Sequence, residues 1–340
     1  MAQSEKRVNQ LDIARAAGVS TATVSRALNG TGIVKPEARA RIDAAIAELG
    51  YMPNGAARAL ASRRSHTVGA VIPTLASAIF AAGIDAFEQR LNEAGLTLLL
   101  SLSNYDLDSE ALKVRRLLER GVDAIMLIGS SHAPEVHETI ARAGRPYVHS
   151  WAWEAEDQHP YVGFDNVAAA RTVAHHLADL GHRDLAMIAG IAEGNDRAAG
   201  RIAGTIAGLR ERGIELPADR IVETAYTHAA AREALGEILS AGAPTAVICG
   251  NDVLATGALL EAQARRLNVP EELSVTGFDD LPLMEHLNPP LTTVVVPAEA
   301  MGHGAADSLI RALNDGKPAL GRQLPAKLLV RQTTGPVNNG

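Results

Sequence analysis

The stretch LDIARAAGVSTATVSRAL, residues 11–28, predicts two short helices joined by a tight turn. Asn9 is placed to cap the first helix, and Gly18 ends it because glycine adopts the left-handed conformation without strain. Ser20 is placed to cap the second helix. Apolar residues recur at helical spacing, so the two helices are expected to pack together. They are Ile13, Ala14 and Ala17 in the first helix and Val24, Ala27 and Leu28 in the second.

The second helix is expected to present short polar side chains to solvent. This outer face consists of Thr21, Ala22, Thr23, Ser25 and Arg26. A small polar face with one Arg suits contact with base edges in a DNA major groove. The same pattern also fits an ordinary helical hairpin at the start of a globular domain, because such hairpins are common.

Length and composition indicate a globular protein of two or three domains. The chain has 340 residues, of which 47% are hydrophobic and 21% charged. No run approaches the ~18 apolar residues of a membrane span, and no apolar segment follows the first residues, MAQSEKR. The one cysteine, Cys249, excludes an internal disulfide framework and is expected to be a buried thiol. Together these features predict a cytoplasmic protein without membrane contact.

Charge is distributed unevenly along the chain. Residues 1–66 hold ten Lys and Arg against five Asp and Glu, a charge of +5. The net charge of the whole chain is −7, so the remaining residues carry −12. A small basic head on a large acidic body is typical of a phosphate-binding module joined to a domain that does not bind DNA.

A third helix is expected from Pro36 to Leu49, because Pro36 suits a first helical turn and Gly50 suits a helix end. Three short helices around one small core form a DNA-reading unit of familiar size.

The next residues, 51–64, read YMPNGAARALASRR. Asn54 is placed to cap a short helix over 55–61, which is too short to be stable alone. It is therefore expected to order only on a partner copy or on DNA. The alternative interpretation is a plain interdomain linker.

Three motifs in this order resemble the LacI family of bacterial transcription repressors. They are the helix-turn-helix with its core VSTATVSR (residues 19–26), the pair Asn29-Gly30, and the segment from Tyr51 through Pro53-Asn54 to Leu60. The likeness extends through the body to about residue 331.

The resemblance implies a set of DNA-binding residues. Thr21, Ala22 and Arg26 occupy base-reading positions, and Leu60 stands where paired leucines insert into the minor groove at the operator centre. The implied set is Thr21, Ala22, Thr23, Ser25, Arg26, Asn29, Tyr51, Asn54, Ala57 and Leu60. Two residues depart from the family pattern. Gly55 loosens the short helix by roughly 1 kcal/mol relative to Ala, and Lys35 stands where a capping Ser or Thr is usual.

From Thr67 onward, short apolar strands alternate with amphipathic helices, which predicts parallel sheets covered on both faces. The expected strands are 68–72, 97–102, 124–128, 147–149, 185–189, 246–249, 273–276 and 293–296. The expected helices are 79–94, 109–120, 167–180, 198–212, 229–241, 253–266 and 298–313. Eight strands with their helices are more than one parallel sheet usually holds, so two doubly wound α/β lobes are expected.

The resemblance implies that this body has the periplasmic-binding-protein-like fold, with the chain crossing between lobes near 163–166, 291–296 and 320–326. The expected domains are therefore a helix-turn-helix unit over 1–52, a hinge over 53–66 and an effector-binding and dimerisation domain over 67–340. A ligand is expected in the cleft between the lobes, outside the carboxyl ends of the strands.

Several residues near strand ends match family ligand contacts. Phe80 and Tyr226 match cleft aromatics, and Arg201 matches a bidentate ligand arginine. Asn251 and Asp279 match polar contacts. Aromatic faces with Arg, Asn and Asp are typical of a sugar site. The alternatives are core packing for the aromatics, a surface ion pair for Arg201 and a simple turn at Asp279.

Trp151 and Trp153 stand out in a chain with only 3% aromatic residues. They follow an expected strand that ends at the cleft, so Trp151 joins the candidate effector contacts. The segment around them is most similar to gluconate-type repressors within the family. That likeness implies a sugar acid whose carboxylate meets Arg201 or Arg197. The alternative is that both Trp residues cover the lobe surface.

No catalytic motif is present. The chain lacks Gly-x-Ser-x-Gly, a Walker loop and His-Glu-x-x-His. The eleven histidines are scattered without ligand spacing, and adjacent His175 and His176 diverge on a helix. We therefore expect no enzyme activity, no cofactor and no bound metal.

The expected function is a ligand-responsive, sequence-specific transcriptional regulator that represses a carbohydrate or sugar-acid operon. It is expected to bind pseudo-palindromic operator DNA as a homodimer. No heptads follow Arg331, so no tetramerising tail is expected. A solute-binding protein of a sugar transporter is the alternative, although it would need a signal peptide and no helix-turn-helix. A sugar-metabolising enzyme would need a catalytic set that is missing.

Overall fold

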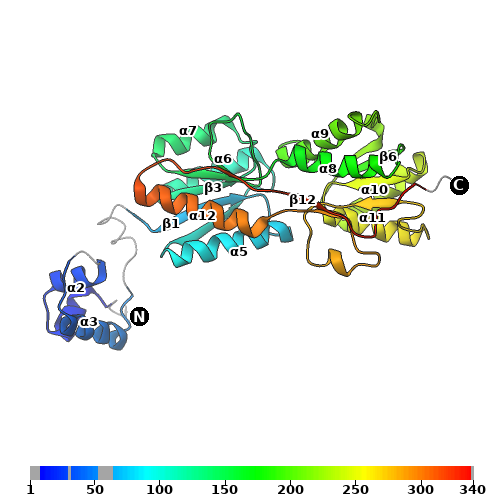
Figure 1. Ribbon diagram of the computed structural model, residues 1–340. Coiled ribbons are helices and arrows are strands. Elements are labelled where there is room, and N and C mark those ends of the chain that lie inside the picture. The colour runs from blue at the N-terminus through cyan, green and yellow to red at the C-terminus, as the bar shows by residue number, and fades with distance from the viewer. Residues whose placement is uncertain (1–7, 30–31, 53–63, 338–340) are drawn as a thin grey trace, which may run out of the picture. The chain divides into compact units, whose positions relative to one another are not determined.

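The computed structural model describes residues 8–29, 32–52 and 64–337. The chain divides into two compact units, residues 1–66 and 67–340 (Figure 1). Each unit is described by itself below.

The first unit is a three-helix bundle formed by α1 (Gln10–Ala17), α2 (Thr21–Asn29) and α3 (Pro36–Leu49). One fully buried residue from each helix lies at the centre of its core: Ile13, Val24 and Ile42. Arg39 of α3 joins the helices further, because its Nη1 donates to the backbone carbonyl of Ala27 at 2.9 Å.

The helix ends follow the local sequence signals. Asn9 accepts from the amide of Leu11, and the Asp12 carboxylate accepts from the amide of Asn9, which makes a reciprocal capping box. Gly18 adopts φ 63° at the end of α1, as predicted. Lys35 precedes α3, but its side chain makes no capping hydrogen bond. Pro36, in the first turn, is the local feature that favours the start of this helix.

The second unit contains two parallel sheets (Figure 1). The first has the order β11-β5-β4-β3-β1-β2 and the second β7-β6-β8-β9. The strands of the first sheet are β1 (Thr67–Ile72), β2 (Thr97–Leu102), β3 (Ala124–Ile128), β4 (Tyr147–Ser150), β5 (Tyr161–Gly163) and β11 (Arg322–Gln323). Those of the second are β6 (Leu185–Gly190), β7 (Ile221–Thr224), β8 (Ala246–Cys249) and β9 (Ser274–Thr276).

Helices cover both faces of each sheet. The first sheet carries α5 (Ala78–Glu93), α6 (Leu107–Glu119), α7 (Pro134–Ala143) and α12 (Ala298–Asp315). The second carries α8 (Asn166–Asp179), α9 (Asp196–Arg210), α10 (His228–Ala241) and α11 (Asp252–Ala264). Strand residues alternate between the two layers: Met126 of β3 packs on the side of α5 and α12, whereas Leu127 packs on the side of α6 and α7. Both faces of a strand are therefore buried, which explains the continuous apolar runs.

The chain passes between the two sheets in three places. It leaves the first sheet after β5 to enter α8, returns from β9 through β10 (Thr293–Val295) to α12, and leaves again after β11. The last passage runs through β12 (Lys327–Leu329), which pairs antiparallel with β10. In Figure 1, β12 lies between the two lobes.

The predicted fold class is confirmed: a helix-turn-helix unit precedes an α/β body of parallel sheets. Sequence reasoning missed β5, β7, β11, β12 and α7. The four strands hold between two and four residues, and β7 and β12 are only half-buried, so neither length nor alternation marks them. The short 3-10 helices Ala218–Arg220 and Met284–His286 were also not predicted. Among the described residues, every helix is too short or too polar to cross a bilayer.

Candidate functional site

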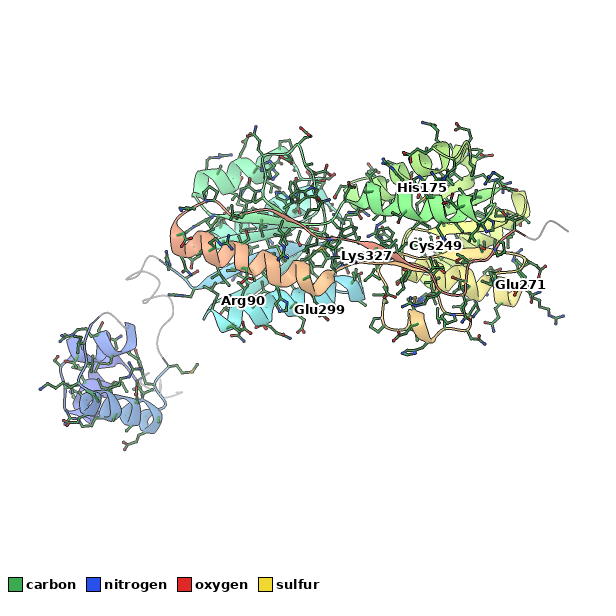
Figure 2. The ribbon with its side chains drawn as sticks, in the orientation of Figure 1. Arg90, His175, Cys249, Glu271, Glu299 and Lys327 are labelled. Carbon is green, nitrogen blue, oxygen red and sulfur yellow. The ribbon has the colours of Figure 1, made fainter. Side chains whose placement is uncertain are left out.

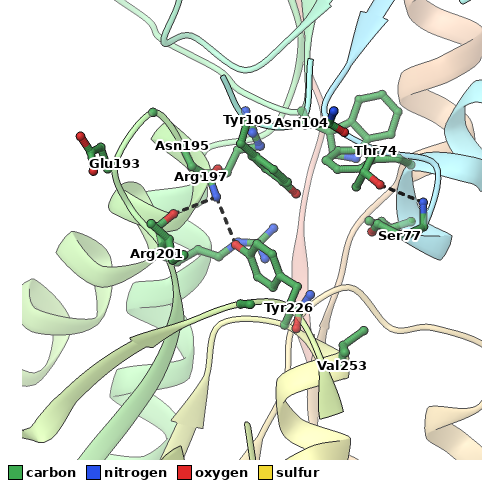
Figure 3. Close-up of a pocket in the computed structure, with 18 of the residues that line it drawn as sticks. Thr74, Ser77, Asn104, Tyr105, Glu193, Asn195, Arg197, Arg201, Tyr226 and Val253 are labelled. Atoms are coloured by element: carbon green, nitrogen blue, oxygen red, sulfur yellow. Dashed lines mark hydrogen bonds between the residues drawn. The ribbon is translucent and has the colours of Figure 1, made fainter. Parts of the chain in front are cut away.

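A cavity of about 740 Å³ lies at the carboxyl ends of the strands of both sheets. Figure 3 shows its walls, with residues from the first lobe facing residues from the second. All six residues proposed from the sequence line it: Phe80, Trp151, Arg201, Tyr226, Asn251 and Asp279. The topology thus brings together side chains that lie as much as 199 positions apart, from residue 80 to residue 279.

Arg201 is held in a fixed position at the base of the cavity. Its Nε donates to Asn166 Oδ1 at 3.1 Å and its Nη1 to the carbonyl of Gly250 at 2.6 Å. The guanidinium also stacks on Phe278, with 3.8 Å between Cζ and the ring centre. Only 9% of its side chain is exposed. Arg201 is therefore a buried, preorganised cation, and the surface ion pair weighed above does not describe it.

Two buried carboxylates influence each other here, and one of them, Asp279, lies beside Arg201. Burial raises the pKa of Asp279, although the nearby Arg201 partly offsets this. Burial, followed by the charge of Asp279, raises the pKa of Asp252. Asp252 accepts from Thr293 Oγ1 at 2.6 Å and from the amide of Leu281 at 2.8 Å, so it anchors the loop after β9. Asp279 is not the solvated turn of the alternative interpretation.

Two polar atoms of the cavity residues have no hydrogen-bond partner. They are Nε1 of Trp151 and Oδ1 of Asp279, the latter 3.5 Å from Nη2 of Arg201. Buried polar atoms are normally paired, because an unpaired one costs about 1–3 kcal/mol. Both atoms are buried in the walls of the empty cavity, so neither is presented to its interior.

The same two residues have unusual backbone conformations. Trp151 has φ 63° and Asp279 has φ 121°, in the region that favours glycine. Asn104 and Tyr105, with φ 56° and 63°, also line the cavity. Strained backbone conformations persist only where the surrounding structure holds them in place, and they occur most often at binding sites.

Tyr226 and Tyr105 form a facing aromatic pair, with ring centres 6.2 Å apart. Asn195 Nδ2 donates to the hydroxyl of Tyr226 at 3.3 Å (Figure 3). Burial raises the pKa of Tyr105 to about 12, so its hydroxyl stays protonated and can donate to a ligand. Gly190 makes room for this wall, because a Cβ there would lie 2.1 Å from the Tyr226 ring.

Phe80 and Trp151 form the opposite aromatic wall. Their ring centres are 5.5 Å apart in an edge-to-face arrangement. Asn251 caps α11 through Oδ1, which accepts from the amide of Leu254 at 2.9 Å. Its Nδ2 is then the donor that Asn251 can offer a ligand.

Sequence reasoning missed part of the lining. Tyr105, Asn104 and Asn195 were not proposed, and Arg197 was named only as an alternative partner for a carboxylate. Tyr105 follows β2 at its carboxyl end, so the strand-end rule applied to every strand would have found it. Trp153 lies elsewhere, in a smaller pocket with Glu154 and Asp165.

The proposed DNA-reading face lies on α2 of the first unit. Thr21, Ala22 and Arg26 are exposed, and Thr23 and Ser25 are half-buried. Tyr51 differs, because its ring packs into the core of this unit and only 9% of it is exposed. Asn54, Ala57, Leu60 and the side chain of Asn29 lie outside the described residues.

The expectation of scattered histidines is wrong at one place. His137, His149 and His159 carry ring nitrogens that all lie within 4.8 Å of one another. Cys249, by contrast, is buried as expected (Figure 2), and burial raises the pKa of its thiol.

Comparison with known proteins agrees with this architecture. The family profile described as "Bacterial regulatory proteins, lacI family" matches residues 11–54, and "Periplasmic binding protein-like domain" matches residues 174–334. Catabolite control protein A of Priestia megaterium is 34% identical over 325 residues, covering 95% of this chain and 98% of that protein.

Solved structures give the same result. A lac repressor dimer bound to operator and the anti-inducer ONPF has a TM-score of 0.87 at 27% identity, covering 97% of this chain and 100% of the other. A complex of the transcriptional regulator CelR with cellobiose has a TM-score of 0.70 at 30% identity, with 96% and 100% covered.

Fold, cavity and helix-turn-helix together define a ligand-responsive DNA-binding transcriptional regulator, not an enzyme. The chain belongs to the LacI family of bacterial regulatory proteins.

Proposed function

We propose that this regulator works as a homodimeric repressor in the cytoplasm and reads a pseudo-palindromic operator. Two copies of α2 would enter successive major grooves, with Thr21, Ala22 and Arg26 facing the base edges. The lac repressor dimer on its operator, similar over 97% of this chain, supports the proposal.

The proposed effector is a sugar or a sugar acid that occupies the cavity between the lobes. The observation that carries this is a buried arginine, Arg201 stacked on Phe278, in a cavity lined by the aromatic rings of Phe80, Tyr105 and Tyr226. Hydroxyl groups of the ligand can accept from Asn251 Nδ2 and from the hydroxyl of Tyr105. The aromatic walls suit the apolar faces of a pyranose ring.

A carboxylate on the ligand would be favoured by the two guanidinium groups of the cavity. Arg201 and Arg197 both line it, and Arg197 Nη1 is already bound to Asp196 at 2.7 Å and to the carbonyl of Ile128 at 3.3 Å. Arg201 is likewise bound to Asn166 and to the carbonyl of Gly250, so Arg201 and Arg197 are both candidates for the ligand carboxylate. The cellobiose complex of CelR supports a carbohydrate over a nucleobase.

Effector binding would act through the lobes. Asn251, Asp279 and Arg201 belong to the second lobe, whereas Phe80 and Trp151 belong to the first. A ligand that contacts both sets favours one arrangement of the lobes over another, and so biases an equilibrium between operator-binding and non-binding states.

A thermal-shift screen tests the effector assignment first. D-Gluconate, D-glucuronate, D-glucose and D-cellobiose are added to the full-length protein. A ligand at a hundred times its dissociation constant adds about 2.7 kcal/mol to the stability of the folded chain. A response to the acids identifies a sugar acid, and a response to neutral sugars alone replaces it with a sugar. No response to any sugar or acid would overturn the carbohydrate proposal.

The matched variants are Arg201→Ala and Arg212→Ala. Arg212 follows the same helix α9 but pairs with Asp179 on the surface, away from the cavity. The first variant should lose the thermal shift and the second should keep it. DNA binding is tested separately by selecting operators from random duplexes. A protein that selects no duplex would instead support the solute-binding alternative.

A further inference from the structure

The histidine cluster on the first lobe lies outside the effector cavity and has no part in the function proposed above. His137 belongs to α7, His149 to β4 and His159 to the loop between β4 and β5. These elements lie side by side because β4 pairs with β3 and β5, and α7 covers the same face of the sheet (Figure 1). Three imidazole rings from three elements therefore converge beneath one helix.

The ring nitrogens are close to the spacing that one metal ion requires. Nε2 of His137 and Nε2 of His149 are 3.1 Å apart, and the three ligand nitrogens all lie within 4.8 Å. Two nitrogens on one tetrahedral Zn²⁺ are about 3.3 Å apart, from a Zn–N distance of about 2.0–2.1 Å. His159 sits on a loop and is half-buried, so its ring can tilt to close the remaining distance.

His149 is fixed in the form that a metal needs. Its Nδ1 donates to the carbonyl of Gly129 at 2.9 Å, which places the lone pair on Nε2, the nitrogen facing His137. A carbonyl that holds the second ring nitrogen is the usual support of a metal-binding histidine.

The ring of His159 is supported as well. The hydroxyl of Tyr147 hydrogen-bonds Nδ1 of His159, which leaves Nε2 of His159 for a ligand. Asp157, whose Oδ1 lies 3.8 Å from Nε2 of His159, adds negative charge at the exposed side.

A second layer of buried polar groups stands behind the cluster. Nε2 of His132 lies 2.9 Å from Nδ1 of His149, and Nδ1 of His132 lies 2.7 Å from Oε2 of Glu110. The side chains of His132 and Glu110 are 0% and 7% exposed. Four histidines and a carboxylate on one face of a sheet are costly to bury, and an ordinary apolar core would need none of them.

We propose that His137, His149 and His159 form a binding site for a divalent transition metal such as Zn²⁺. Three imidazole ligands favour Zn²⁺, Co²⁺, Ni²⁺ or Cu²⁺ over Mg²⁺ or Ca²⁺, which prefer oxygen ligands. The half-exposed side near His159 leaves the fourth position for water.

Metal binding at this site would act on the effector cavity through two short connections. His149 is two residues before Trp151, which lines the cavity. Gly129, whose carbonyl holds His149, follows Ile128, whose carbonyl accepts from Arg197 of the other lobe. A bound ion would therefore fix the ends of β3 and β4 against which the second lobe closes.

The experiment is a titration of tag-free, full-length protein with Zn²⁺ against a chromogenic chelator. One tight site per chain is expected, and Co²⁺ should give the visible absorption band of a tetrahedral complex. Mg²⁺ and Ca²⁺ should not compete. Absence of a stoichiometric site, or equal competition by Mg²⁺, would overturn the proposal.

The variants are His137→Gln and His159→Gln, because both residues are partly exposed and their loss spares the buried His149. Each should weaken Zn²⁺ binding by more than about 100-fold, beyond the range typical of outer-layer partners. Tyr147→Phe, which keeps the ligands, should weaken it by about tenfold. His286→Gln is the control, since His286 is a surface residue with a side chain that is 70% exposed. Equal affinity in the control and the His137 variant would place the metal elsewhere.

Discussion

Nη2 of Arg201 lies 3.5 Å from Oδ1 of Asp279, and both side chains are buried at the point where the two lobes meet. Neither group is exposed enough to be compensated by water, so each is stabilised by the other. This pair links the stability of the fold to the chemistry of the cavity.

Replacement of Arg201 by Met should therefore destabilise the protein most at high pH. It leaves the Asp279 carboxylate buried without a cation, which costs about 3 kcal/mol or more when the acid is ionised. Burial already raises the pKa of Asp279 to about 6, so at pH 5 the acid is mostly protonated and the loss should be smaller. Urea unfolding at pH 5 and pH 8 measures the difference. A double variant with Asp279→Asn should recover part of the loss at pH 8, and equal losses at both pH values would contradict this account.

Asp252 should make the stability of the protein fall as pH rises. Burial raises its pKa from 3.8 to about 8 in the folded chain. Between those values the folded chain holds a proton that the unfolded chain releases, so the free energy of unfolding decreases with rising pH. Asp252→Asn can still accept from Leu281 and donate to Thr293, and it should flatten the dependence between pH 5 and pH 8. An unchanged slope in this variant would assign the effect to other groups.

Two substitutions at helix starts in the first unit should change its stability in opposite directions. Asn9→Ala removes the capping box of α1 and should cost about 1 kcal/mol. Lys35→Ser introduces a cap where α3 has none and should add up to about 1 kcal/mol. Amide hydrogen exchange of Ile13 and Ile42 in the full-length protein reports both changes. Slower exchange in the first variant, or faster exchange in the second, would be inconsistent with the observed helix ends.

Two glycines of α12 provide a matched test of packing. A Cβ at Gly302 would lie 2.1 Å from the backbone oxygen of Gly83 on α5, so neither helix can yield locally. Gly302→Ala should cost about 3 kcal/mol. At Gly304 the nearest atom is a methyl group of Val162 at 2.9 Å, which can rotate away. Gly304→Ala should stay within about 1 kcal/mol of the parent, because better helix propensity offsets the contact. Thermal unfolding of both variants distinguishes the positions, and equal losses would show that α5 and α12 can separate.

Much of the fold was predictable because its signals are local. Asn9, Gly18 and Pro36 mark helix ends within a few residues of sequence, and the apolar runs of β1 and β3 follow from burial on both faces. The short strands β5 and β11 carry no comparable signal, since they exist only because a neighbouring strand offers hydrogen bonds.

The cavity was predictable in part. The strand-end rule and the family resemblance pointed to six residues that now line one cavity, whereas Tyr105 and Asn195 were missed. The position of Tyr105 after β2 was a usable signal, whereas the positive φ of Asn104 and Tyr105 was not, because neither residue is glycine.

The sequence by itself determined the helix-turn-helix, the family and the parallel α/β lobes, because capping, periodicity and motif order are properties of consecutive residues. Only the tertiary structure decided the buried pairing of Arg201 with Asp279 and the convergence of His137, His149 and His159. Those histidines are 12 and 10 residues apart and form no ligand motif. They meet because the order of strands in the sheet, which no short stretch encodes, places β4 beneath α7 and beside the loop that leads to β5.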